Sequence, residues 1–169
     1  MKIEITQRVQ APADLDRLHD LTRELVGKAC WGAKLGYGDE LTLDLGGRVP
    51  RLPRSAPPKE KGEWVLRARA TPWTIEPAPD DPPEDDPGAL LRKIEGATIT
   101  EVEIGHPDLS LTITFSNQYT LRLVPEPDEA EEADEDGLAY WEIFGPRDAV
   151  IEVGPGPVWT FSQDEADAS

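Results

Sequence analysis

Two stretches, Leu25–Leu45 (LVGKACWGAKLGYGDELTLDL) and Ile94–Ile113 (IEGATITEVEIGHPDLSLTI), align along their length with one single-residue gap. The alignment matches glycines, aspartates and branched apolar residues, in the pairs Gly27/Gly96, Leu35/Ile104, Gly36/Gly105, Asp39/Asp108, Leu41/Leu109 and Leu43/Leu111. Each stretch then continues through a charged segment to a tryptophan, which pairs Trp64 with Trp141. Self-similarity at a fixed offset is typical of a repeated supersecondary unit, so the sequence predicts that the fold contains one unit twice.

The hydropathy pattern around these stretches predicts one helix and many strands. A stripe of leucines at helical spacing between Pro12 and Gly27 predicts a helix over about 13–26, with Gly27 just after its end. Residues 29–36 and 40–45 alternate as the two arms of a hairpin, and 89–95 form a short helical turn in the second unit. Further strands are predicted at 2–10, 48–52, 63–70, 73–76, 97–104, 109–116, 118–124, 138–144, 148–153 and 157–162.

These elements predict a mainly β (α+β) fold with one N-terminal helix. Two similar four- to five-stranded β units with pseudo-twofold symmetry would share one core, as a sandwich or a partly closed barrel. We expect a single domain over 1–163, with the units at about 20–76 and 89–162. An acidic, Pro-rich linker at 77–88 joins them, and 164–169 form an acidic tail.

Composition limits the class of protein. The 169 residues contain one cysteine, Cys30, which excludes an internal disulfide framework and a multi-cysteine metal site. The first residues alternate polar and apolar side chains without the apolar core of a signal peptide, and no apolar run reaches membrane-spanning length. We therefore expect a cytoplasmic protein that does not contact a membrane.

The formal net charge of −17 comes from three segments. Residues 75–88, 125–137 and the residues after Gln163 together hold 17 acids and no base, so the rest of the chain is neutral. Such runs are usually solvated, and their few apolar side chains predict a small contribution to stability. Nucleic acid is disfavoured as a partner, because binding to phosphates needs a basic face.

The residues that could carry catalysis fit structural roles better. Cys30 lies between apolar neighbours on a predicted strand, where a thiol is usually buried and unreactive. His19 and His106 lack the spacing of a zinc site. Asp39 and Asp108 could form a carboxylate pair, but aspartate in a turn commonly accepts a hydrogen bond from the backbone two residues on. We therefore expect no catalytic residue, no metal and no cofactor.

Several of these motifs resemble a family of small uncharacterised, β-rich bacterial proteins, notably of actinobacterial type. They are the stretch from Gly27 to Gly46, the later segments Lys61-Gly-Glu-Trp and Ala70-Thr-Pro-Trp, and Tyr140-Trp-Glu-Ile-Phe-Gly-Pro. The resemblance covers about residues 20–160. It implies a compact β fold and no particular activity.

Three functional hypotheses remain open. The first is a non-catalytic protein-binding module, of immunity or accessory type, whose acidic loops face a basic partner. The second is a small-molecule-binding β protein with a Trp-lined cleft, and the third is a hydrolase that uses Asp39 and Asp108. The first predicts partner-binding residues in both acidic segments and in an exposed C-terminal aromatic patch: Asp80, Asp81, Asp85, Asp86, Glu129, Glu131, Glu132, Asp134, Trp159 and Phe161. The sequence does not fix the oligomeric state.

Overall fold

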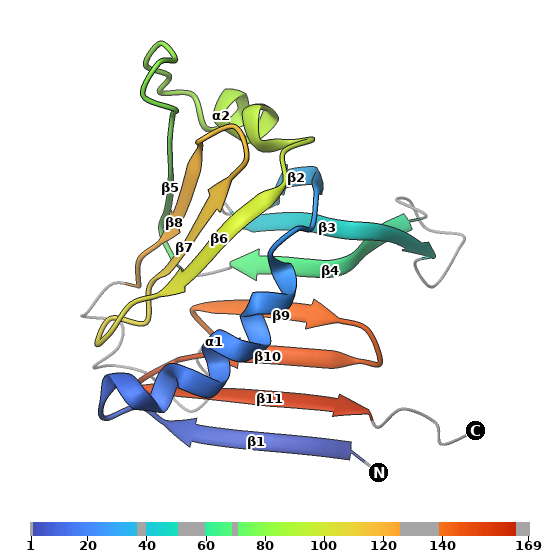
Figure 1. The fold of residues 1–169 in the computed structure, drawn as a ribbon, viewed down its shortest axis with the longest axis vertical. Helices are drawn as coiled ribbons and strands as arrows, with labels where there is room; N and C mark the ends of the chain where they lie inside the picture. Colours follow the sequence, from blue (N-terminus) through green and yellow to red (C-terminus); the bar gives the residue numbers. More distant parts are fainter. Residues whose placement is uncertain (1, 37–39, 51–59, 69–70, 126–138, 165–169) are drawn as a thin grey trace.

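The computed structural model describes residues 2–36, 40–50, 60–68, 71–125 and 139–164. Within these ranges the chain forms two antiparallel sheets, of seven and four strands (Figure 1). The sheets are separate layers and do not close into a barrel. The predicted mainly β fold with an N-terminal helix is therefore confirmed, in its layered form.

The larger sheet has the strand order β1-β11-β10-β9-β4-β3-β2. Its strands are β1 (Lys2–Arg8), β2 (Cys30–Leu35), β3 (Leu41–Pro50), β4 (Glu60–Ala68), β9 (Trp141–Gly145), β10 (Ala149–Val153) and β11 (Val158–Asp164). The smaller sheet has the order β5-β8-β7-β6. Its strands are β5 (Trp73–Glu76), β6 (Ile99–Ile104), β7 (Leu111–Phe115) and β8 (Thr120–Leu123).

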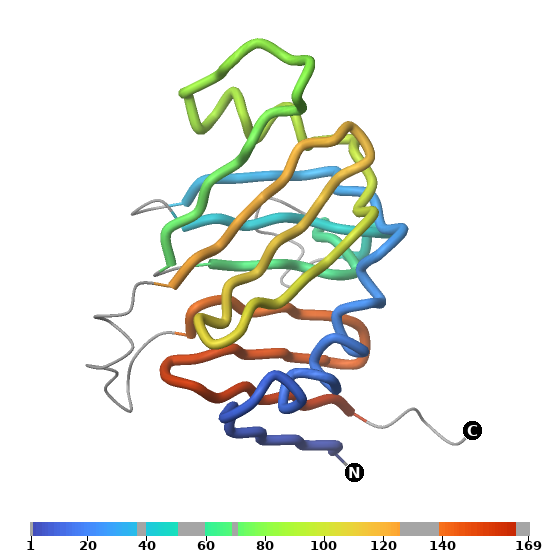
Figure 2. The backbone as a smooth tube through the Cα atoms, turned by 60° about the vertical axis from the view of Figure 1, so that its left-hand side comes forward, coloured from blue at the N-terminus to red at the C-terminus, as the bar shows by residue number. Residues whose placement is uncertain are grey.

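The N-terminal helical segment and the smaller sheet cover the same face of the larger sheet. The segment consists of the 3-10 turn η1 (Pro12–Leu15), α1 (Asp16–Thr22) and the 3-10 turn η2 (Arg23–Leu25). It buries Leu15, Leu18 and Leu25, as the predicted leucine stripe requires. In Figures 1 and 2 α1 crosses β9–β11, while the four-stranded sheet crosses β2–β4 on the same side. The other face of the larger sheet has no described layer over it.

The two predicted units follow the same order of elements. Each begins at a helix end, η2 or α2 (Pro87–Ile94), and continues through a glycine into a hairpin, β2–β3 or β6–β7. Gly27 and Gly96 have φ angles of +91° and +88°, a left-handed conformation that glycine adopts without steric cost and that commonly ends helices. The third strands, β4 and β8, complete two similar meanders.

Equivalent backbone atoms join the two units. The N–H of Gly27 donates to the carbonyl of Ile99, and the N–H of Gly96 donates to the carbonyl of Cys30, at 2.8 and 2.6 Å. In the same way Cys30 donates to Ala97 and Ile99 donates to Lys28, at 2.8 and 2.9 Å. The bridge between Ala29 and Thr98 lies at the centre of this set. The hydrogen bonds are thus related by a local pseudo-twofold axis.

The strand register corrects part of the sequence alignment. Leu35 pairs with Leu41 in the first hairpin, and Ile104 pairs with Leu111 in the second. Leu41 is therefore equivalent to Leu111 and not to Leu109, so the predicted register of the second arm was wrong by two residues. The error arose because a two-residue slip keeps the alternation of inward and outward side chains.

Each unit contributes its fourth strand to the sheet of the other. After β4 the chain leaves the larger sheet, and β5 pairs with β8 of the second unit. After β8 it leaves the smaller sheet, and β9 pairs with β4 of the first unit. The correspondence thus covers β2–β5 and β6–β9, whereas β10, β11 and β1 extend the larger sheet beyond it.

This exchange also corrects the predicted pairing of tryptophans. Ile75 pairs with Leu121, and Ile143 pairs with Leu66, which occupies the same place in the first meander. Trp141, two residues before Ile143, is therefore equivalent to Trp73, two residues before Ile75. The prediction that Trp64 matches Trp141 was wrong, because a search along the chain does not detect that the strands change sheets.

We predict that Gly62→Ala destabilises the fold by about 1–3 kcal/mol or more. A Cβ at Gly62 would overlap the backbone of Leu45 and Trp64, and the strand pair there cannot separate without losing hydrogen bonds. Gly47→Ala is the matched control, because its Cβ would meet no atom within 4 Å. Denaturant unfolding of both variants tests this, and equal midpoints would contradict the predicted crowding.

Candidate functional site

The acidic linker is fixed at both ends. Ala78 is buried, and the hydroxyl of Tyr119 donates to Asp81 Oδ2 at 2.6 Å. At the other end the N–H of Ala89 donates to Asp86 Oδ2 at 3.1 Å, so Asp86 caps α2. The hydrogen bond to Asp81 raises the pKa of Tyr119. The predicted acidic linker is therefore held to the rest of the fold at these positions.

The acidic residues of this segment, including the two that anchor it, are exposed to solvent. Within 80–86 five acids are exposed: Asp80, Asp81, Glu84, Asp85 and Asp86. The structure thus places the four predicted residues of this segment together, on a short stretch held at Tyr119 and at α2. The other four acids, Glu129, Glu131, Glu132 and Asp134, lie outside the described residues, as does Asp39.

The predicted C-terminal aromatic patch is wrong. Trp159 and Phe161 have exposed fractions of only 1% and 8%, because both point to the inner face of β11. Phe161 lies opposite Ile5 and Ile151 in the register, and Trp159 Nε1 donates to the carbonyl of Asp14 at 3.0 Å. These aromatic side chains therefore fill the core beneath the N-terminal helical segment and do not form a contact surface.

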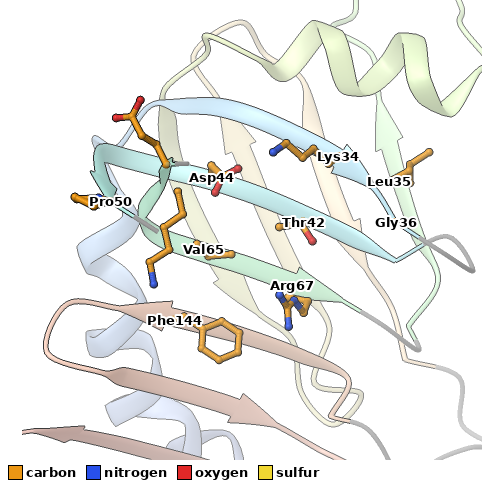
Figure 3. A pocket seen from close by; sticks show the side chains of 11 residues that line it. Lys34, Leu35, Gly36, Thr42, Asp44, Pro50, Val65, Arg67 and Phe144 are labelled. Carbon is orange, nitrogen blue, oxygen red and sulfur yellow. The ribbon is translucent and has the colours of Figure 1, made fainter. Parts of the chain in front are cut away.

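The outer face of the larger sheet carries a hollow that sequence reasoning missed (Figure 3). Its volume is about 600 Å³, and residues of β2, β3, β4 and β9 line it. Lys34, Thr42, Asp44, Val65, Arg67 and Phe144 form much of its surface. Its described lining contains no tryptophan, so it is not the predicted Trp-lined cleft.

Among the charged side chains of the hollow, Arg67 forms an ion pair, whereas two lysines form none with a described residue. Arg67 Nε lies 3.3 Å from Glu40 Oε1, and the guanidinium carbon lies 5.6 Å from the centre of the Phe144 ring. Asp44 is 5% exposed and accepts a hydrogen bond from the N–H of Gly62 at 3.0 Å. Lys34 and Lys61 form no ion pair with a residue in the described part of the chain. These two lysines therefore present positive charge on a strongly acidic protein.

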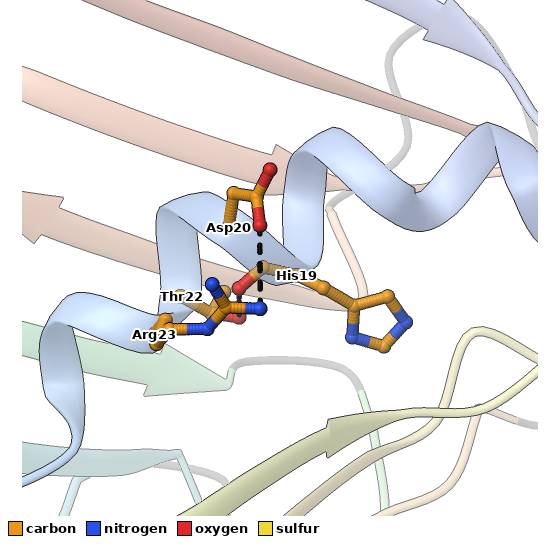
Figure 4. Close-up of polar contacts among 4 residues, drawn as sticks. All are labelled: His19, Asp20, Thr22 and Arg23. Atoms are coloured by element: carbon orange, nitrogen blue, oxygen red, sulfur yellow. Dashed lines mark hydrogen bonds and ion pairs between the residues drawn. The ribbon is translucent and has the colours of Figure 1, made fainter.

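The remaining candidate residues that the structure describes include Cys30, His19 and Asp108. Cys30 is fully buried, as predicted, and burial raises the pKa of its thiol to about 12. His19 contributes its backbone carbonyl to Thr22, while its ring points away from the Asp20–Arg23 ion pair (Figure 4). Asp108 accepts the N–H of Ser110 at 3.1 Å, which confirms its predicted turn role. No group of three or more potential metal ligands occurs among the described residues.

Some of the residues that line the hollow could be predicted from the sequence. Alternation along residues 41–45 places Thr42 and Asp44 on the face opposite the buried leucines. The same pattern places Arg67 on that face of the next strand. Phe144 could not be added, because its position depends on the pairing of β9 with β4, about 80 residues apart in the chain.

No family model, curated protein or solved structure matches this chain. The resemblance to actinobacterial-type β proteins therefore stays a prediction. No helix in the described ranges is long and apolar enough to cross a membrane.

We predict that the thiol of Cys30 reacts with a disulfide reagent at least about tenfold more slowly in the native protein than in the denatured chain. A raised pKa keeps the thiol protonated, so the native rate should stay low from neutral pH to about pH 9, where an unfolded thiol ionises. The chain has one cysteine, so the signal reports Cys30 alone. Equal native and denatured rates would show that the strand pair at Cys30 opens readily.

Asp86→Ala should lower the free energy of unfolding by about 0.5–2 kcal/mol, because it removes the N-cap of α2. Asp85→Ala is the matched control, since it removes the same charge from the neighbouring exposed position. Thermal or denaturant unfolding measures the difference. If both variants lose the same stability, the cap does not hold α2.

Proposed function

We propose that the protein is a non-catalytic protein-binding module, of immunity or accessory type, and that its acidic segment 80–86 engages a basic partner. The observation that supports this is the exposure of five acids on a segment whose ends are fixed. A fixed segment presents its charges without the loss of chain entropy that ordering a free loop would require. The proposal retains the cytoplasmic location predicted from the sequence.

Electrostatics gives this segment a specific role in association. A concentrated negative field attracts a basic surface from a distance, so it speeds encounter and excludes acidic partners. At physiological salt the attraction reaches about 8 Å from the charges. We therefore expect the segment to govern the association rate and its salt dependence more than the lifetime of the complex.

The proposal can be tested with two variants of equal charge. Asp80→Asn, Glu84→Gln and Asp85→Asn remove three exposed charges and leave both anchors, Asp81 and Asp86, intact. Glu24→Gln, Glu101→Gln and Glu103→Gln remove three exposed charges elsewhere and serve as the control. A basic partner captured from the native host at low salt should associate about tenfold more slowly with the first variant, and with a flatter salt dependence. Equal association rates for the two variants would contradict the proposal.

The alternative is a small-molecule-binding protein that uses the hollow of the larger sheet. Its volume falls within the range of ligand pockets. Lys34 and Lys61 would then bind an anionic group, with the Phe144 ring beside it. Calorimetric titration with small anions distinguishes this function from the first, because it does not involve segment 80–86.

We also propose that the two units arose by internal duplication. The reciprocal hydrogen bonds between Gly27, Cys30, Gly96 and Ile99 support this origin.

A further inference from the structure

The outer face of the larger sheet presents two rows of side chains that run across all seven strands. Paired residues in the register define both rows, since directly paired residues point to the same face. From β2 to β1 the first row is Lys34, Thr42, Arg67, Glu142, Glu152, Thr160 and Thr6. The second row is Gly32, Asp44, Val65, Phe144, Val150, Ser162 and Glu4.

These rows divide the face into three zones. The half formed by β2–β4 carries Lys34, Arg67 and Asp44, with Lys61 and Glu60 at its margin. The half formed by β10, β11 and β1 carries Glu152 and Glu4, and Lys2 and Arg8 lie at the two ends of β1. Between the halves a half-buried apolar strip crosses the middle strand: Val65, Phe144 and Val150. An apolar centre with charged surroundings is typical of a protein interface.

The arrangement is complementary to itself. The middle strand of the seven is β9, so a twofold axis parallel to the strands and above β9 exchanges β4 with β10, β3 with β11 and β2 with β1. It places Arg67 opposite Glu152 of a second copy. It also places Val65 opposite Val150 of the second copy and Phe144 opposite its own equivalent. Self-complementarity of this kind is what an isologous dimer requires.

We propose that this face binds a second copy of the chain, in a face-to-face dimer of the two larger sheets. Sheets pack in this way about 10 Å apart with their strands at about 30°, so the pairs above meet approximately. The half of each copy that carries Glu4 and Glu152 faces the hollow of the other, where Lys34 and Lys61 have no ion pair with a described residue. This interface goes beyond the proposed function and does not use segment 80–86.

Two repulsive interactions would oppose this dimer, and the structure and the salt in solution weaken both. Glu142 would face its own equivalent at the axis, but Arg67 lies directly beside it on β4 of the same chain. Each copy carries a formal charge of −17, and at physiological salt repulsion is screened beyond about 8 Å. Three segments outside the two rows hold acids equal in number to that whole charge. The attraction between Arg67 of one copy and Glu152 of the other acts within the interface, at shorter range than this repulsion.

Charge reversal tests the pairing itself. Arg67→Glu and Glu152→Arg should each weaken the dimer about tenfold or more, because the axis places every altered pair in the interface twice. An equimolar mixture of the two variants should form a heterodimer, since Glu replaces Arg67 in one chain and Arg replaces Glu152 in the other. Both opposed pairs are then of opposite charge. Sedimentation equilibrium of each variant alone and of the mixture measures this.

The control variant is Arg122→Glu, which reverses a half-exposed charge on the outer face of the smaller sheet. It should leave the dimer unchanged, and circular dichroism establishes that all variants are folded. A monomeric wild-type protein at every concentration would overturn the proposal. Variants that remain dimeric, or a mixture that stays monomeric, would also overturn it.

Discussion

The fold depends on one set of backbone hydrogen bonds, those that join Gly27 and Cys30 to Ile99 and Ala97, together with their pseudo-symmetric equivalents. These bonds hold the edge strands β2 and β6 of the two sheets together at the bridge Ala29–Thr98. Cys30, Ala97 and Ile99 are buried, and their backbone polar groups would each cost about 1–3 kcal/mol if they were left unpaired there. The pairing therefore fixes how the two sheets are placed on each other.

Because β5 and β9 are exchanged between the two units, the two sheets depend on each other for their stability. Each sheet contains a strand that belongs in sequence to the other unit, so neither unit can complete its sheet alone. Buried polar contacts reinforce the exchange: the hydroxyl of Thr71 donates to the carbonyl of Tyr140 at 2.6 Å, and Trp141 Nε1 donates to the carbonyl of Leu109 at 3.0 Å. Because β10, β11 and β1 extend only one sheet, the described part of the molecule is asymmetric, and one large face of the larger sheet has no described layer over it. The hollow and the self-complementary rows both lie on this face.

Local features of the fold were predictable from the sequence, whereas the pairing of distant strands was not. The leucine stripe before Gly27 predicts a helix and the alternation in residues 41–45 predicts a strand, because each pattern depends only on residues close together in the chain. The change of sheet after β4 and β8 left no local signal, so Trp141 was matched to Trp64. Trp159 and Phe161 were expected at the surface because their burial depends on the helical segment packed over β11. The hollow was missed for the same reason, since it needs β9 beside β4.

Native-state hydrogen exchange tests the central claim most directly, that the two units unfold as one. The amides of Cys30 and Ile99 occupy equivalent positions, and each donates across the junction to the other unit. The exchanged-strand fold predicts that both amides exchange only through global unfolding, with equal free energies of opening that match the stability from denaturant unfolding. If these two amides exchanged through an opening of clearly lower free energy than global unfolding, one unit could open while the other stayed folded. The mutual dependence of the sheets would then be wrong.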